Sequence, residues 1–184
     1  EKKSDEYDVL KNPKLYSSLH LPDANPFLPE NANLLPEPIN KINNPILLEK
    51  SKGLKLYYKQ DTDFQRPKAS YNYKIYYPEK YSDLNSQVLM KLYIAAVNES
   101  MNEASYPAKL AGMNYSVSND AEGISIIVSG YSDSIDDLLL EIINNMNSID
   151  IPDEQFDAMK DQMIREWKNI DLGDAYRIAR ENMR

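Results

Sequence analysis

The chain has no cysteine and a single histidine, and these absences limit the nucleophilic and metal chemistry that it can carry. Without cysteine there is neither a disulfide framework nor a cysteine nucleophile. A Ser-His-Asp triad would have to use His20, because no other histidine is present. Catalytic zinc commonly takes three protein ligands, and His20 stands in Ser-Leu-His-Leu-Pro without a neighbouring ligand. We expect His20 to be a surface or packing residue and not a metal ligand.

Glycine and long apolar runs are also scarce. The five glycines are scattered singly, which excludes a glycine-rich phosphate loop. No run approaches the roughly 18 apolar residues that a membrane span requires. The formal net charge of -8 opposes a general affinity for nucleic-acid backbones. The sequence therefore predicts neither a nucleic-acid partner nor a membrane partner. An acidic surface suits basic peptides, or serves solubility alone.

Three groups of carboxylates invite comparison with a metal site: Asp61 with Asp63, Glu99 with Glu103, and Asp133 with Asp136 and Asp137. The first pair is better explained as a solvated loop, since no glycine-bearing calcium loop surrounds it. The second pair lacks the flanking histidines of a zinc motif. The third group suits the positive end of a helix dipole. The sequence thus predicts no catalytic, no cofactor-binding and no metal-binding residue.

Proline is concentrated at the start of the chain, where seven of the eleven prolines precede residue 46. The segment 21–38 cannot be a helix, because proline removes backbone donors and restricts the residue before it. An extended linker, or a strap over another surface, is the remaining interpretation. Phe27, Leu28, Leu34 and Leu35 indicate that this segment lies against something.

The uneven distribution of proline divides the chain into two parts. Residues 1–45 form a Pro-rich linker together with the end of a preceding domain, and residues 46–184 form an α/β domain. The chain opens without methionine and stops inside a helix-like pattern, so we expect a piece of a longer protein, truncated at its C-terminus.

Alternation and turn residues predict the strands. The segments 46–50 and 54–59 flank a turn at 51–53 and form a hairpin. In the strand 69–77, the side chains of Tyr71, Tyr73, Ile75 and Tyr77 share one face. Two further strands, 115–117 and 124–131, surround a turn at 119–123.

Helical spacing predicts three helices. The first is capped by Ser82 or Asp83, is interrupted near Ser105 by Pro107, and ends at Gly112. Its apolar stripe is Leu84, Val88, Leu89, Leu92, Tyr93, Ala96 and Val97.

The second helix is capped by Ser134 with Asp137, and the third begins at Pro152. The third carries a stripe that we interpret as core: Phe156, Met159, Met163, Trp167 and Ile170. Hairpins beside helices favour an α+β fold, an antiparallel or mixed sheet packed by helices on one face.

Several blocks in one order give the chain a family resemblance. They are Leu21-Pro-Asp-Ala-Asn-Pro-Phe-Leu-Pro29, Leu56-Tyr-Tyr-Lys-Gln-Asp-Thr-Asp-Phe64, Pro67-Lys-Ala69 and the stretch from Tyr106 to Tyr131. Together they resemble the zinc metallopeptidases of the pitrilysin and insulin-degrading enzyme type, also called the insulinase family. The matching region is similar to the third, middle domain, preceded by the connection between the two halves.

That resemblance implies four similar α/β domains in two bowl-like halves that enclose a chamber for peptides. The first domain carries the zinc motif His-x-x-Glu-His, and the third shares its fold without the motif. The long helix 83–102 occupies the corresponding place here and holds no ligand. The resemblance therefore implies an inactive domain of a zinc metalloendopeptidase that forms chamber wall and contacts between halves. Its implied partners are peptide substrates and the other domains of the same chain.

Two alternatives stay open from the sequence. One is a catalytically inactive scaffold or binding subunit of the same fold, which would lack the zinc motif throughout its length. The other is an unrelated α+β interaction module. Under the peptidase interpretation, we expect an apolar face left bare by the missing fourth domain to make the isolated chain self-associate.

Overall fold

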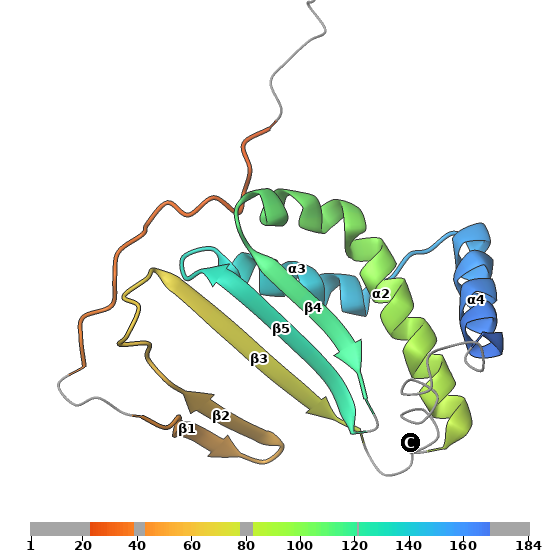
Figure 1. Ribbon diagram of the computed structural model, residues 1–184, viewed down its shortest axis with the longest axis horizontal. Helices are drawn as coiled ribbons and strands as arrows, with labels where there is room; N and C mark the ends of the chain where they lie inside the picture. Colours follow the sequence, from red (N-terminus) through yellow and green to blue (C-terminus); the bar gives the residue numbers. More distant parts are fainter. Residues whose placement is uncertain (1–22, 39–42, 78–82, 121, 170–184) are drawn as a thin grey trace, which may run out of the picture.

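The computed structural model describes residues 23–38, 43–77, 83–120 and 122–169. The elements in chain order are β1 (Ile46–Ser51), β2 (Leu54–Tyr58), β3 (Lys68–Tyr76), α2 (Leu84–Leu110), β4 (Asn114–Asn119), β5 (Gly123–Tyr131), α3 (Ile135–Asn147) and α4 (Asp153–Lys168). This arrangement confirms the predicted α+β fold (Figure 1).

The strands form two separate antiparallel sheets. The larger sheet has the order β3-β5-β4, and β1 and β2 pair only with each other among the described residues. Both predicted hairpins are present, and the β1–β2 hairpin has an irregular register between Leu47 and Glu49. In the larger sheet, Tyr71 lies opposite Val128 and Tyr73 opposite Ile126, so the predicted face of β3 is the face that carries the buried residues of β5.

Helices α2 and α3 cover one face of the larger sheet, and the core lies between them and the strands (Figure 1). Val97 and Met101 of α2, Val128 of β5, and Ile135 and Leu138 of α3 are fully buried there. Burying each such side chain contributes roughly 1.5–3 kcal/mol. The Tyr93 hydroxyl also donates to the Met146 carbonyl at 2.7 Å and so fastens α2 to α3.

The prediction for the boundaries of α2 is partly right. Asp83 caps its first turn by accepting from the Ser86 N–H at 3.0 Å, and Gly112 follows its end at φ +75°. The predicted break at Ser105 is wrong, since one helix runs through Pro107. Proline removes only one backbone donor, and the buried Ser105 and Ala108 hold the last turns against the sheet.

The predicted stripe of α2 is confirmed at Ala96 and Val97, which are buried, and is wrong at its N-terminal end. Leu84 and Leu89 are 71% and 66% exposed, whereas the unpredicted Ile94 and Met101 are buried. The sheet covers only the second half of the helix, so apolar positions in the first half have no strand beneath them (Figure 1).

The interpretation of the α4 stripe as core is wrong. No residue of α4 is buried, and Phe156 and Trp167 are 40% and 45% exposed. The helix lies beside α2 on the side away from the strands, so its apolar side chains never reach the sheet (Figure 1). Ile170 lies outside the described residues. The prediction for the start of α3 fails in one detail, because Ser134 takes the N-cap position but its side chain makes no capping hydrogen bond.

Candidate interaction surface

The face of the larger sheet opposite the helices is uncovered within the described chain, and we call it the open face (Figure 1). Side chains alternate across each strand, so the register defines its members. They are Lys68, Ser70, Asn72, Lys74 and Tyr76 of β3, Asn114, Ser116 and Ser118 of β4, and Ser125, Ile127, Ser129 and Tyr131 of β5.

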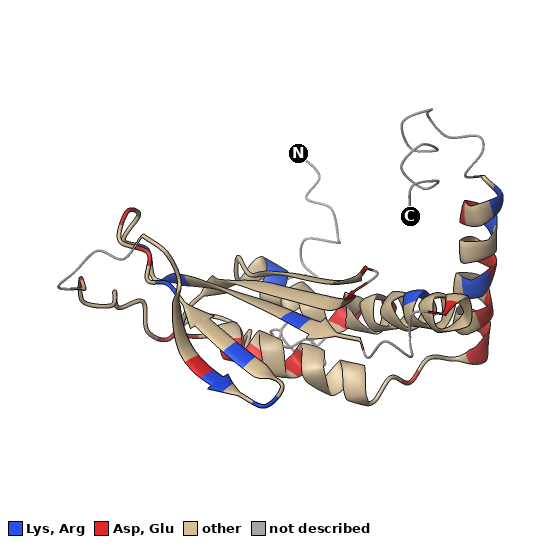
Figure 2. Ribbon diagram, turned by 90° about the horizontal axis from the view of Figure 1, so that it is seen from below, with Lys and Arg blue, Asp and Glu red and all other residues tan. Residues whose placement is uncertain are grey.

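The open face is built mainly from small hydroxyl and amide side chains. One row across the strands reads Ser116, Ile127 and Asn72, with Ile127 43% exposed at the centre. The strands of this sheet carry few charges, which are denser on the β1–β2 hairpin and on α4 (Figure 2). Such a surface can exchange hydrogen bonds with a polypeptide, and it holds no carboxylate or imidazole that could act as a general base.

One ion pair borders the open face. The Lys74 ammonium donates to the Asp120 carboxylate and lies 3.4 Å from the Ser125 hydroxyl. The hydrogen bond from Lys74, together with the Glu122 and Gly123 N–H groups, holds the pKa of Asp120 below its usual range. Asp120 therefore remains ionised in mildly acidic solution, and the pair fixes the turn between β4 and β5.

The segment 25–37, which we call the strap, runs along one end of the sheet and joins the core by one side chain (Figure 1). Phe27 is 6% exposed and packs in the core cluster, which confirms the prediction that this segment lies against a surface. Leu28, Leu34 and Leu35 are 52–67% exposed, so the contact is narrower than the sequence suggested. The Asn25 side-chain amide also donates to the Pro107 carbonyl at 2.8 Å.

Asp133 holds the next part of the strap. One of its carboxylate oxygens accepts from the N–H groups of Glu30 and Asn31, both at 2.9 Å. No pattern in the sequence indicates this role, because the two partners lie about a hundred residues earlier in the chain. The neighbouring Asp136 lies beside Tyr71, and burial first, then the hydrogen bond to Asp136, raise the pKa of the Tyr71 phenol.

The other carboxylate pairs serve local structure. Asp61 accepts from the Asp63 N–H at 3.0 Å and so closes its own turn, which agrees with the loop interpretation. Glu99 accepts from the Asn102 side-chain amide at 3.1 Å on the same helix. His20 lies outside the described residues. Within the described ranges, no three His, Cys, Asp or Glu side chains gather in a way that could hold a metal ion.

No helix in the described part of the chain combines the length and apolarity needed to span a bilayer.

Comparison with solved structures shows which known fold this domain shares. The crystal structure of pitrilysin matches with a TM-score of 0.77 at 20% sequence identity, over 96% of this chain and 19% of the pitrilysin chain. The layered α+β unit is therefore the kind of domain found in that peptidase.

Comparison of sequences gives the family. Residues 2–184 match the family model described as the middle or third domain of peptidase M16. Human insulin-degrading enzyme is 33% identical over 160 residues, which are 87% of this chain and 16% of the enzyme. The putative zinc protease mug138 of Schizosaccharomyces pombe is 31% identical over 170 residues, 92% of this chain and 18% of that protein. The chain belongs to the insulinase, or pitrilysin-type, peptidase family as its middle domain, and it spans less than a fifth of these relatives.

Proposed function

We propose that this chain is a non-catalytic domain of a zinc-dependent metalloendopeptidase, in which the open face forms part of the wall of a peptide-holding chamber. The observation that carries the proposal is the open face itself, a sheet surface of hydroxyl and amide groups that no described helix covers. The insulin-degrading enzymes and the putative zinc protease among the relatives support a peptidase as the parent. Peptides and the other domains of the parent are the proposed partners.

The residues that the structure describes do not fit a zinc site. The described ranges hold no converging set of histidine and carboxylate ligands, and the helix α2 presents no ligand pair toward the sheet. We therefore propose that zinc is bound by the first domain of the parent. The middle domain takes no chemical part in hydrolysis. Its contribution is to position peptides and to contact the opposite half.

The chamber role is testable in the parent enzyme by charging the open face. Replacing Ile127 by glutamate should raise KM for peptide hydrolysis several-fold, equivalent to about 1 kcal/mol of lost binding, and leave zinc content unchanged. Leu89→Glu, at a position 66% exposed on α2, is the matched control and should leave KM unaltered. Equal effects of both variants would contradict a wall function for the open face.

Chelation of the same parent protein distinguishes the proposed domain of an active peptidase from an inactive scaffold subunit. A parent with His-x-x-Glu-His upstream should lose peptidase activity on chelation, whereas a scaffold subunit has none to lose. The 184-residue chain alone should bind no stoichiometric zinc by elemental analysis and cleave no peptide. Stoichiometric zinc in that chain, or chelator-sensitive activity, would overturn the proposal.

Exposed apolar groups support the proposed contacts with other domains. The side chains of Phe156, Ile164 and Trp167 on α4 are each 40–45% exposed. In the isolated chain such a stripe favours self-association. Light scattering over a concentration series should show a rising average mass, and Trp167→Gln should reduce the rise. A strictly monomeric chain at all concentrations would contradict this expectation.

A further inference from the structure

The outer edge of β3 presents a row of unpaired backbone groups. The Tyr77 N–H donates to the Glu122 carbonyl at 2.8 Å, and the Ser132 N–H donates to the Pro67 carbonyl at 3.0 Å. Between these two bonds the antiparallel register is continuous, so odd-numbered residues of β3 bond to β5. The N–H and C=O groups of the even-numbered residues point away from β5, where no described strand pairs with them: Lys68, Ser70, Asn72, Lys74 and Tyr76.

The opposite edge of the same sheet, strand β4, is covered by a helix. Helix α2 packs along β4, and the Asn98 side-chain amide donates to the outward carbonyl of Val117 at 3.1 Å. Proteins commonly protect edge strands by such covers, by proline, or by bulges. Strand β3 has neither proline nor bulge over its nine residues, and no described helix covers its outer edge. Its two lysines turn over the open face, Lys74 to Asp120 and Lys68 to a point 5.1 Å from the Tyr131 ring, so they leave the edge clear.

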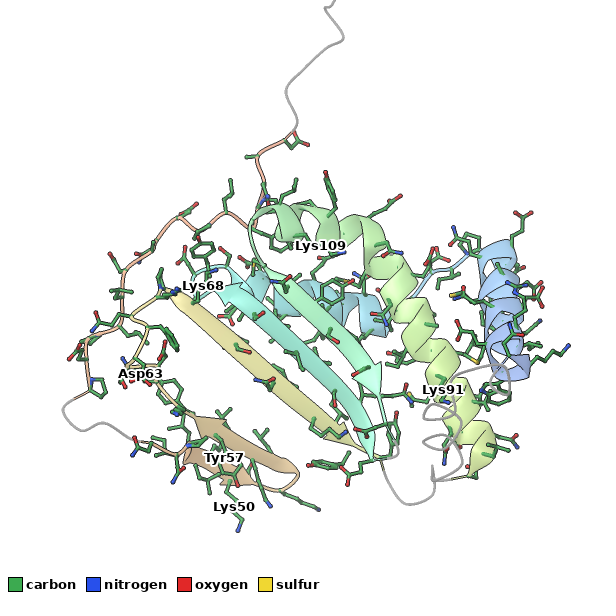
Figure 3. All side chains as sticks on the ribbon, in the orientation of Figure 1. Lys50, Tyr57, Asp63, Lys68, Lys91 and Lys109 are labelled. Atoms are coloured by element: carbon green, nitrogen blue, oxygen red, sulfur yellow. The ribbon has the colours of Figure 1, made fainter. Side chains whose placement is uncertain are left out.

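A large groove lies between this edge and the β1–β2 hairpin. Its volume is about 1710 Å³, which exceeds the roughly 300–1,000 Å³ of small-molecule pockets. All five residues of β2 line one side, β3 lines the other, and Leu34 and Leu35 of the strap also contribute. Figure 3 labels Tyr57 on the hairpin and Lys68 on β3, the two elements that border the groove.

No other described strand pairs with the hairpin. Every residue of β1 and β2 is exposed, including Leu54, Leu56 and Tyr57 at 44–57%. An isolated two-stranded hairpin is marginally stable in water and needs a third strand or a packed face. An extended backbone between the two borders of the groove would supply a partner to both of them.

We propose that an extended segment of the parent polypeptide enters this groove, pairs with the outer edge of β3, and joins the hairpin and the larger sheet. A pleated segment would place alternate apolar side chains against Leu54, Leu56 and Tyr73. The chain spans only 16–18% of its human and yeast relatives, so a longer parent of the kind proposed above has ample polypeptide to supply the segment. The inference rests on the proposed function only in taking the segment from such a parent.

The charged residues around the groove indicate which charge the bound segment would carry. Basic residues outnumber acidic ones in the lining, in contrast to the net charge of -8 for the whole chain. The basic residues are Lys50, Lys55, Lys59, Arg66, Lys68 and Lys74, of which Lys74 is paired with Asp120, and the acidic ones are Glu37, Asp61 and Asp136. A neutral or acidic strand is therefore favoured over a basic one.

Hydrogen exchange tests the proposal directly. In the 184-residue chain, the amides of Ser70, Asn72 and Lys74 should exchange at least tenfold faster than those of Tyr71 and Tyr73. In the parent protein without added peptide, the even-numbered amides should become as slow as the odd-numbered ones. Fast even-numbered amides in the parent would overturn the proposal. Protection that appears only with added peptide, or only as the isolated chain dimerises, would overturn it too, by assigning the edge to another occupant.

A proline substitution supplies a matched pair of variants. Asn72→Pro removes only an outward donor, so it should leave the unfolding midpoint of the 184-residue chain nearly unchanged. In the parent it should restore fast exchange at Ser70 and Lys74 and open the hairpin to protease. Asn72→Ala keeps the donor and should do neither. These readouts are independent of zinc and peptide hydrolysis, so their failure is distinguishable from failure of the proposed function.

Discussion

Replacing Gly123 by alanine is expected to lower the free energy of unfolding by about 3 kcal/mol, the upper part of the range for overpacked sites. A Cβ at this position would lie 1.9 Å from the Ile75 carbonyl oxygen and 2.8 Å from its carbon. Both are backbone atoms of β3, so no side-chain rotation relieves the contact. Strand β3 has to move away from β5 at the end where Gly123 lies opposite Tyr76. Urea unfolding followed by circular dichroism measures the loss.

Ser125→Ala is the control for this prediction. The position lies two residues along the same strand, on the open face, where the Ser125 hydroxyl lies 3.4 Å from the Lys74 ammonium. Its loss should cost at most about 1 kcal/mol. If Gly123→Ala unfolds at the same urea concentration as the wild type, the close approach of β3 at this point is wrong.

Removing the Phe27 ring should produce the second large effect. Phe27→Ala should destabilise the chain by about 3 kcal/mol, because truncating a buried phenylalanine loses its transfer free energy and leaves a cavity. The side chain is 6% exposed and packs in the main core although it belongs to a proline-rich segment. Equilibrium unfolding in urea measures the change.

Two further variants locate the source of that effect. Leu35→Ala, at a position 67% exposed in the same strap, should change stability by less than about 0.5 kcal/mol. Asp133→Ala should cost about 1 kcal/mol, since it leaves the Glu30 and Asn31 N–H groups to water. Equal small effects at Phe27 and Leu35 would mean that the strap is not part of the cooperative unit.

Periodicity in the sequence predicted an element correctly wherever the apolar face that it indicates is also the face that is buried in the structure. The alternation of Tyr71, Tyr73 and Ile75 gave the correct face of β3, and Gly112 marked the end of α2. The predictions failed where a partner distant in sequence decides burial. The stripe of α4 has the spacing of a core helix, yet the sheet does not extend beneath it.

The candidate surface was harder to predict than the fold. The open face consists mainly of serine and asparagine residues, which in a sequence are indistinguishable from ordinary solvated positions. Only the register places Ser116, Ile127 and Asn72 in one row. The role of Asp133 likewise depends on backbone donors far away in the chain, and a carboxylate at a helix start already has a sufficient local explanation.

The strap also determines how force would travel through the domain. It is fastened at three points: Asn25 to the end of α2, Phe27 to the core, and residues 30 and 31 to Asp133 just before α3. A pull arriving along the strap from its N-terminal side would load those attachments before it reached the hairpin. The strap is therefore held stiffly at the domain surface between Asn25 and Asn31.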